Sequence, residues 1–140
     1  MLDYKEVDRD VFFKDASSIT YRDDDIKEAK EFGCSSIIAC FNRALAPFSR
    51  FFIVYEDEVA VCAIMLRRDG NIVFFISNTI KSNIGLIKKL RELAHLVVGC
   101  CGTIITKTAL WYDEAQRLNN IIGFKPYKLN DKFGLYILER

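Results

Sequence analysis

The sequence has only two prolines, one histidine and one tryptophan among its 140 residues. It contains no apolar run near the roughly 20 residues that a membrane-spanning helix needs, so no transmembrane helix is predicted. Internal repeats, low-complexity stretches and Pro/Gly-rich linkers are also lacking. These absences, together with the length, predict one domain over residues 1–140 with a core of its own.

The five cysteines form no regular framework. Their odd number and the lack of a Cys-x-x-Cys spacing predict free thiols in a reducing compartment. Adjacent Cys100 and Cys101 near His95 do not match the usual zinc spacings, so we expect no metal site. A lone histidine on a helix is more often a surface residue than a catalytic base.

The net charge of +1 is unevenly distributed. Residues 1–31 hold ten acidic and six basic side chains, whereas residues 32–140 hold nine acidic and fourteen basic ones. This asymmetry leaves open an anionic partner for the C-terminal part, although two ordinary solvated faces are the simpler explanation. No basic stripe is evident, so nucleic-acid binding is not expected. The polar start of the chain argues against a secretory signal.

The first 50 residues predict an edge strand and two helices. Asp3–Phe13 mixes apolar and charged residues as an edge strand does. Asp23–Asp25 precede a helical stretch that ends at Gly33, and acids favour the positive end of a helix dipole while glycine suits the C-terminal cap. A second, apolar helix over Ser35–Ala46 is ended by Pro47.

The middle of the chain predicts an antiparallel meander. Phe51–Tyr55, Val59–Leu66 and Ile72–Ile76 are apolar runs separated by turn residues, and Asp69-Gly70 is a strong hairpin signal. Because these strands are apolar almost throughout, we expect both faces of the sheet to be covered.

A helix, a strand, a second helix and a hairpin complete the chain. The expected ranges are Ile84–Val98, Thr103–Thr106, Asp113–Ile122, Phe124–Lys128 and Leu135–Leu138. The fold class is therefore α/β, with a mixed sheet of about six or seven strands and about four helices. The loop Ser77–Gly85 joins a strand end to a helix start, where backbone N–H groups and the helix dipole suit a pyrophosphate.

The order of these elements, with a last helix that runs from Ala115 into Gly123-Phe124, resembles the GNAT N-acetyltransferases. The resemblance covers about residues 50–130. It implies a GNAT-like mixed sheet, with an antiparallel meander and a central parallel pair that splays apart. It also implies a site for acetyl-CoA, with the backbone of Phe75–Ser77 pairing with pantetheine. The residues expected to hold the cofactor, if acyl-CoA binds, are Ile76, Asn78, Lys81, Ser82, Asn83 and Gly85.

Three departures from the family pattern predict a degenerate site with no catalytic residues and no resident cofactor. Of the family's glycine-rich phosphate loop only Gly85 remains. Asn119 stands where the family commonly has a tyrosine acid, and an amide cannot act as an acid. Asn71–Asn78 contains no carboxylate that could serve as a base. Trp111-Tyr112 falls where the strands splay, and we expect it either to plug the groove or to be ordinary core.

The segment Asp25–Gly33, combined with the GNAT-like second half, resembles the small internal virion proteins of short-tailed bacteriophages. That resemblance implies a structural or assembly role, with protein partners and a location in the virion or host cytoplasm. Two alternatives remain open, namely an active acyl-CoA-dependent N-acetyltransferase and a phage inhibitor that binds a host protein. Fold alone does not decide among them.

Overall fold

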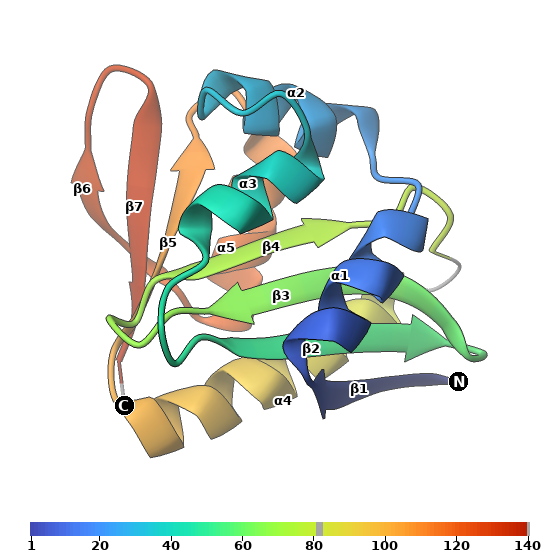
Figure 1. The fold of residues 1–140 in the computed structure, drawn as a ribbon. Coiled ribbons are helices and arrows are strands. Elements are labelled where there is room, and N and C mark those ends of the chain that lie inside the picture. Colours follow the sequence, from blue (N-terminus) through green and yellow to red (C-terminus); the bar gives the residue numbers. More distant parts are fainter. Residues whose placement is uncertain (81–82, 140) are drawn as a thin grey trace.

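The computed structural model describes residues 1–80 and 83–139, and this part of the chain forms seven strands and five helices (Figure 1). In chain order they are β1 Leu2–Val7, α1 Arg9–Ser18, α2 Asp23–Glu31, α3 Ile37–Ala44, β2 Arg50–Glu56, β3 Val59–Leu66, β4 Ile72–Ile76, α4 Asn83–Cys101, β5 Ile104–Ala109, α5 Asp113–Ile122, β6 Lys125–Leu129 and β7 Phe133–Leu138. None of the described helices combines the length and the apolar character needed to cross a membrane.

The strands form two antiparallel sheets that touch at one point. Strands β1-β2-β3-β4 make the first sheet in that order, and β5-β7-β6 make the second. A parallel bridge joins Asn71 to Ile105, where the Ile105 N–H donates to the Gly70 carbonyl at 2.8 Å. Beyond this bridge β4 and β5 diverge (Figure 1). The predicted mixed α/β fold with a splayed central pair is confirmed.

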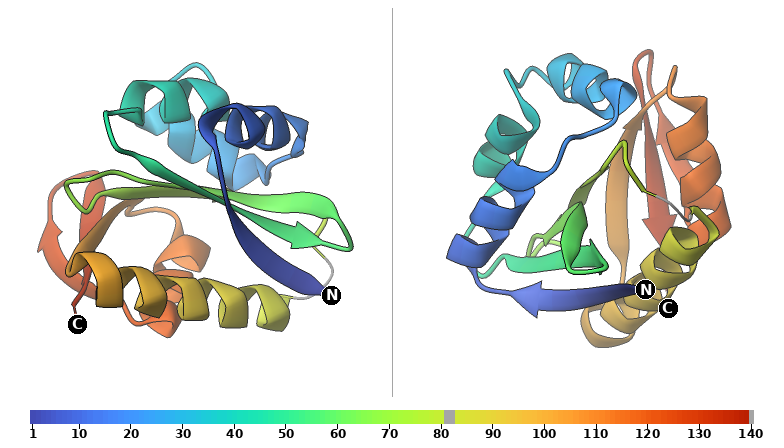
Figure 2. Two further views of the ribbon diagram at one scale, coloured as in Figure 1. Left: turned by 60° about the horizontal axis from the view of Figure 1, so that its bottom comes forward. Right: turned by 90° about the vertical axis from the view of Figure 1, so that its right-hand side faces the viewer.

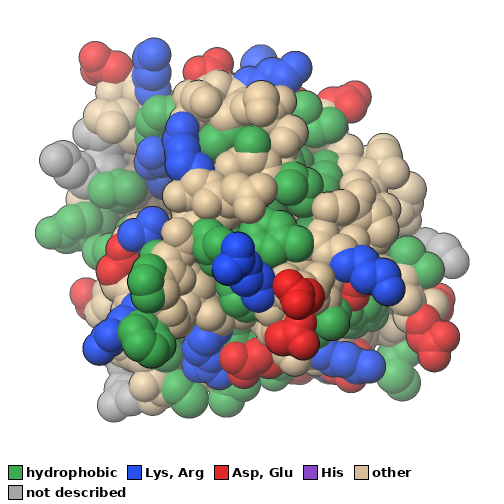
Figure 3. All heavy atoms as spheres, viewed as in Figure 1, with side chains coloured by type: hydrophobic (Ala, Val, Ile, Leu, Met, Phe, Trp, Pro, Cys, Tyr) green, Lys and Arg blue, Asp and Glu red, His purple; other side chains and the backbone are tan. Residues whose placement is uncertain are grey.

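Helices cover both faces of the first sheet, as its apolar strands predicted. Helices α1, α2 and α3 lie on one side, and α4 and α5 lie on the other (Figure 2). Successive residues of β2 alternate between the two cores: Phe51 and Ile53 pack beneath α1–α3, whereas Phe52 and Val54 pack towards α4. On the face of Figure 1, basic and acidic side chains are interspersed and neither charge dominates (Figure 3).

The prediction of an edge strand over Asp3–Phe13 is wrong beyond Val7. The chain turns into α1 because the Asp8 side chain accepts a hydrogen bond from the Val11 N–H at 2.9 Å and so caps a helix. Phe12 is fully buried against the sheet and anchors that helix. The described chain thus has one helix more than expected.

The point where the two sheets touch depends on a glycine. Gly70 has a φ of +91°, and a Cβ at this position would lie 2.7 Å from the Thr103 carbonyl oxygen. Only glycine tolerates both the backbone conformation and this close approach. The β3–β4 hairpin is therefore held against the start of β5, and β4 and β5 diverge only beyond this contact.

Candidate active site

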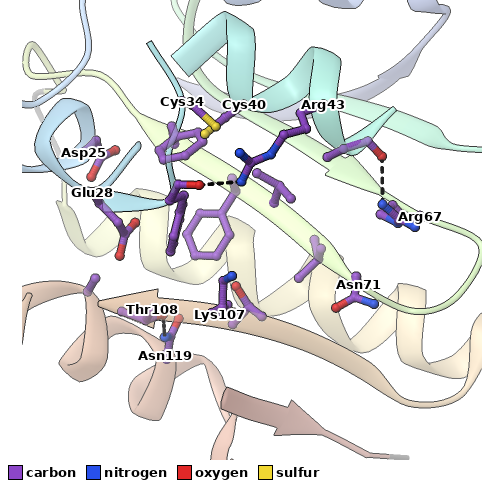
Figure 4. A pocket seen from close by; sticks show the side chains of 18 of the residues that line it. Asp25, Glu28, Cys34, Cys40, Arg43, Arg67, Asn71, Lys107, Thr108 and Asn119 are labelled. Atoms are coloured by element: carbon purple, nitrogen blue, oxygen red, sulfur yellow. Dashed lines mark hydrogen bonds between the residues drawn. The ribbon is translucent and has the colours of Figure 1, made fainter. Parts of the chain in front are cut away.

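The divergence of β4 and β5 opens a cavity of about 380 Å³ beneath α2 and α3, called here the first cavity (Figure 4). Its walls come from α2, α3, α5 and the facing strands β4 and β5. The polar side chains that matter below are Arg22, Asp25, Glu28, Arg43, Arg67, Lys107, Thr108 and Asn119. Asp69 lines the cavity as well, so three carboxylates and several cations share one space that is partly open to solvent.

Asp25 is the most buried of these carboxylates, with 2% of its surface exposed. It accepts hydrogen bonds from the Ile76 N–H at 2.6 Å, from the Arg22 guanidinium at 2.8 Å and from the Tyr112 hydroxyl at 2.5 Å. Burial raises the pKa of Asp25, although Arg22 and the hydrogen bonds oppose that shift. Because three donors bond to its carboxylate, Asp25 has a structural role in the site.

Glu28 lies one helical turn further along α2 and is 7% exposed. Its Oε2 accepts a hydrogen bond from the Ala109 N–H on β5 at 2.9 Å. Its Oε1 forms no hydrogen bond with any residue that the structure describes. Burial raises the pKa of Glu28 to about 7, with a further contribution from the charge of Asp25. A carboxylate that titrates near neutrality beside a cavity is suited to accept a proton.

The burial of two acids on α2 follows from the open edges of the strands. The N–H groups of Ile76 and Ala109 face the gap, where no neighbouring strand pairs with them. A buried N–H group without a hydrogen-bond partner costs free energy, and each of the two carboxylates accepts a hydrogen bond from one of these N–H groups. The sequence had indicated Asp25 only as a dipole-stabilising acid and had not identified Glu28 as functional.

Asn119 on α5 closes the first cavity from the opposite side. It is 1% exposed, and its Nδ2 donates to the Thr108 hydroxyl at 2.8 Å. Its Oδ1 is buried and has no hydrogen-bond partner among the described residues. The amide oxygen is therefore an unpartnered polar atom in the wall of the cavity. Asn119 occupies the position at which the GNAT pattern commonly has a tyrosine.

A second cavity, of about 440 Å³, lies on the other side of the gap between β4 and β5. It is bounded by the end of β4, the start of α4 and helix α5. Three of the residues predicted to hold a cofactor, Ile76, Asn78 and Asn83, line it. Lys81 and Ser82 lie outside the described residues, and Gly85 lies in the first turn of α4. Whether these residues bind acyl-CoA stays a prediction.

The two cavities share a wall. Arg22 and Leu118 line both of them. The Arg22 guanidinium is paired with Asp25 and lies 5.4 Å from the centre of the Tyr112 ring. Its Nε is buried and has no partner among the described residues. A positive charge therefore stands where the two cavities meet.

The backbone predicted to pair with pantetheine is already engaged. Tyr21 and Ser77 form an antiparallel bridge, in which the Arg22 N–H donates to the Ile76 carbonyl at 3.1 Å. The Ser77 N–H donates to the Val61 carbonyl at 2.7 Å. The Ile76 N–H is held by Asp25, as described above. In this structure the segment before α2 takes the place on β4 that the resemblance assigned to the cofactor.

Tyr112 is buried just after β5, which both expectations, a plug of the groove and ordinary core, allow. It is buried and bonds to Asp25, and its ring stacks on that of Trp111 with the centroids 5.2 Å apart. The Lys27 ammonium lies 4.3 Å from the centre of the Trp111 ring on the outer side. Neither Trp111 nor Tyr112 is among the residues that line the two cavities.

No family model matches the sequence, and no curated protein matches it. Solved structures do match the fold. The GNAT domain of S. lividans PAT has a TM-score of 0.73 at 7% identity, over 98% of this chain and 89% of that one. A spermidine N-acetyltransferase from Vibrio cholerae, solved with CoA and spermine, has a TM-score of 0.69 at 10% identity, over 99% and 95%. A GNAT-family acetyltransferase from Bacillus cereus has a TM-score of 0.68 at 14% identity, over 100% and 98%.

These comparisons contradict the prediction of a structural virion protein with a degenerate site. The similar structures are acetyltransferases of the GNAT fold, and none of those reported has a link to a phage particle. The active N-acetyltransferase, held above as an alternative, fits the findings better. Identities this low show the fold alone, however. Protein partners and a location in the virion or cytoplasm stay predictions that none of these findings tests. The chain has the GNAT acetyltransferase fold.

Proposed function

We propose that this protein is an N-acyltransferase that moves an acyl group from acyl-CoA to an amine. The observation that carries the proposal is the pair of cavities on opposite sides of the β4–β5 gap, which meet at Arg22 and Leu118. A transfer between two substrates needs such an arrangement, in which each substrate enters from its own side and the reacting atoms meet at the shared wall.

The second cavity fits the phosphate end of acyl-CoA. It lies against the N-terminus of α4, where the helix dipole favours an anion. Arg117 contributes a positive charge to its lining, which also includes Asp23 and Glu114. Because the N–H and carbonyl of Ile76 are already bonded, the rest of the molecule would contact side chains such as Leu86 and Leu118. When bound, acyl-CoA supplies an acyl group activated as a thioester.

Glu28 is the proposed general base. Its free Oε1 accepts the proton that the amine releases as the amine nitrogen bonds to the acyl carbon and the carbon–sulfur bond breaks. The thiolate of CoA leaves and takes a proton from solvent. Arg22 stabilises the negative charge that develops on the carbonyl oxygen, since it stands at the wall between the cavities.

Calorimetric titration with acetyl-CoA tests the first half of the proposal. The wild type is expected to bind, and Arg117→Glu to bind at least about tenfold more weakly because it places a negative charge beside the phosphates. Lys125→Glu, an exposed charge reversal on β6, is the matched control and should bind as the wild type does. Absence of binding to the wild type at millimolar acetyl-CoA contradicts the proposal.

Release of CoA thiol in the presence of a panel of amines tests the second half. The wild type is expected to release CoA only when an amine is present, and Glu28→Gln to lower kcat by about 10²-fold or more. Equal release by the wild type and Glu28→Gln contradicts the assignment of the base.

A further inference from the structure

Three cations and the carboxylate of Asp69 line the part of the first cavity that lies away from Asp25 and Glu28. Figure 4 shows Asp25 and Glu28 at one end and Arg67 at the other, while Arg43 from α3 and Lys107 from β5 reach in between from opposite walls. Because Asp69 offsets only the charge of Arg67, a polar molecule that fills this cavity meets two carboxylates at one end and a net positive charge along the rest.

Two of the three cations, Arg43 and Lys107, contact neutral groups. Arg43 donates to the Phe32 carbonyl at 2.5 Å, and Lys107 lies 5.0 Å and 4.9 Å from the centres of the Phe32 and Phe133 rings. Within residues 1–80 and 83–139, neither Arg43 nor Lys107 forms an ion pair. These contacts orient the two side chains, and no carboxylate among the described residues pairs with either of them.

Arg67 adds a third cation with unused hydrogen-bonding capacity. Its Nη1 donates to the Ala44 carbonyl at 3.3 Å, and its Nη2 lies 3.1 Å from the carboxylate of Asp69. Its Nε is buried and has no partner among the described residues. A guanidinium carries five N–H donors, so these contacts leave some of them for a ligand.

We propose that the acceptor is an amine that also carries a carboxylate or phosphate group. This inference rests on the proposed function. The amine lies at Glu28, and the anionic group is bound by Arg43, Arg67 and Lys107. Arginine suits this role because its planar donors match the oxygens of a carboxylate or phosphate.

The same charges disfavour a polyamine. A diamine with one nitrogen at Glu28 brings its second cation beside Arg43 and Lys107, where like charges repel in a partly enclosed space. The acceptor class proposed here therefore differs from the spermine bound in the structure of the similar Vibrio cholerae enzyme.

Four acceptors of similar length test the inference: 3-aminopropanoate, 3-aminopropylphosphonate, propylamine and 1,3-diaminopropane. Their kcat/KM values are measured by CoA release. At least one anionic amine is expected to exceed propylamine by about tenfold or more, and the diamine to be poorest. The ratio of the two anionic amines distinguishes a carboxylate from a phosphate site. A diamine that equals or exceeds both anionic amines overturns the inference.

The variants Arg43→Gln and Lys107→Gln test whether these two side chains bind the anionic group of the acceptor. Both side chains line the cavity and are exposed to solvent, so these variants should fold, as thermal unfolding would verify. Each is expected to raise the KM of the better anionic amine about tenfold and to leave propylamine unchanged, whereas the control Lys125→Gln changes neither. Unchanged KM values in both variants overturn the inference. Absent binding of acetyl-CoA would instead overturn the proposed function, and its titration is independent of the acceptor.

Discussion

Asp25 and Glu28, three residues apart on α2, bond to backbone N–H groups on two different strands. Asp25 accepts from Ile76 on β4 at 2.6 Å, and Glu28 accepts from Ala109 on β5 at 2.9 Å. The two carboxylates thus replace the inter-strand hydrogen bonds that β4 and β5 lose where they part. Since the gap between these strands separates the two cavities, one helix both stabilises the opening and supplies the proposed base.

The ion pair between Arg22 and Asp25 predicts that substitutions of these two residues have non-additive effects on the free energy of unfolding. Arg22→Met removes the ion pair and leaves the buried carboxylate uncompensated, so we expect a loss of about 3–5 kcal/mol in the free energy of unfolding. Adding Asp25→Asn removes that charge and should restore part of the loss. Urea unfolding of both single variants and the double variant measures the coupling. Additive losses would contradict it.

The contact between the sheets predicts that Gly70 is intolerant of a side chain. Gly70→Ala forces a Cβ to within 2.7 Å of the Thr103 carbonyl oxygen at a φ of +91°, so we expect a loss of about 1–3 kcal/mol in unfolding free energy. Gly99→Ala on α4 is the control, because its Cβ meets nothing within 4 Å. In a helix that change should stabilise by roughly 0.5–1 kcal/mol. Equal effects of the two substitutions would show that the close approach is unimportant.

The raised pKa of Glu28 predicts how stability depends on pH. The pKa is about 7 in the folded protein against an ordinary value of 4.5, so between these values the folded state binds more protons than the unfolded one. Stability attributable to Glu28 therefore falls as the pH rises from 4.5 to about 7 and is level above that.

Glu28→Gln should remove this dependence and gain stability relative to the wild type across that window, by up to roughly 3 kcal/mol at alkaline pH. Thermal unfolding of both proteins from pH 4 to pH 9 measures the difference. Glu31→Gln, on the exposed face of the same helix, is the control. A constant difference between Glu28→Gln and the wild type at all pH values would contradict the assignment.

Much of the fold was predictable because its signals are local. The Asp69-Gly70 turn and the apolar runs on either side gave the meander. The last helix has the predicted bounds, Asp113–Ile122, and Gly123 ends it with a φ of +121°. Turn chemistry and helix caps depend on neighbours in sequence, which a single sequence displays directly.

The buried acids were not predictable from such signals. The backbone N–H groups that bond to Asp25 and Glu28 lie 51 and 81 residues away in sequence, and nothing local marks an N–H group that a splayed strand leaves unpaired. One signal was present: α2 has no apolar stripe, and its aliphatic Ile26 is 36% exposed. A helix whose inward-facing side chains are polar indicates that these side chains have polar partners in the folded protein. The family pattern places a base on the strand segment Asn71–Asn78, whereas the candidate base of this protein, Glu28, lies on helix α2.

The central claim is that Glu28 is the base in an acyl transfer, and the pH dependence of kcat at saturating acceptor tests it most directly. We expect kcat of the wild type to fall below an apparent pKa of about 7, as Glu28 becomes protonated. For Glu28→Gln we expect kcat to be lower by about 10²-fold or more and to lack that decline. A Glu28→Gln enzyme with the kcat and pH profile of the wild type would contradict the account.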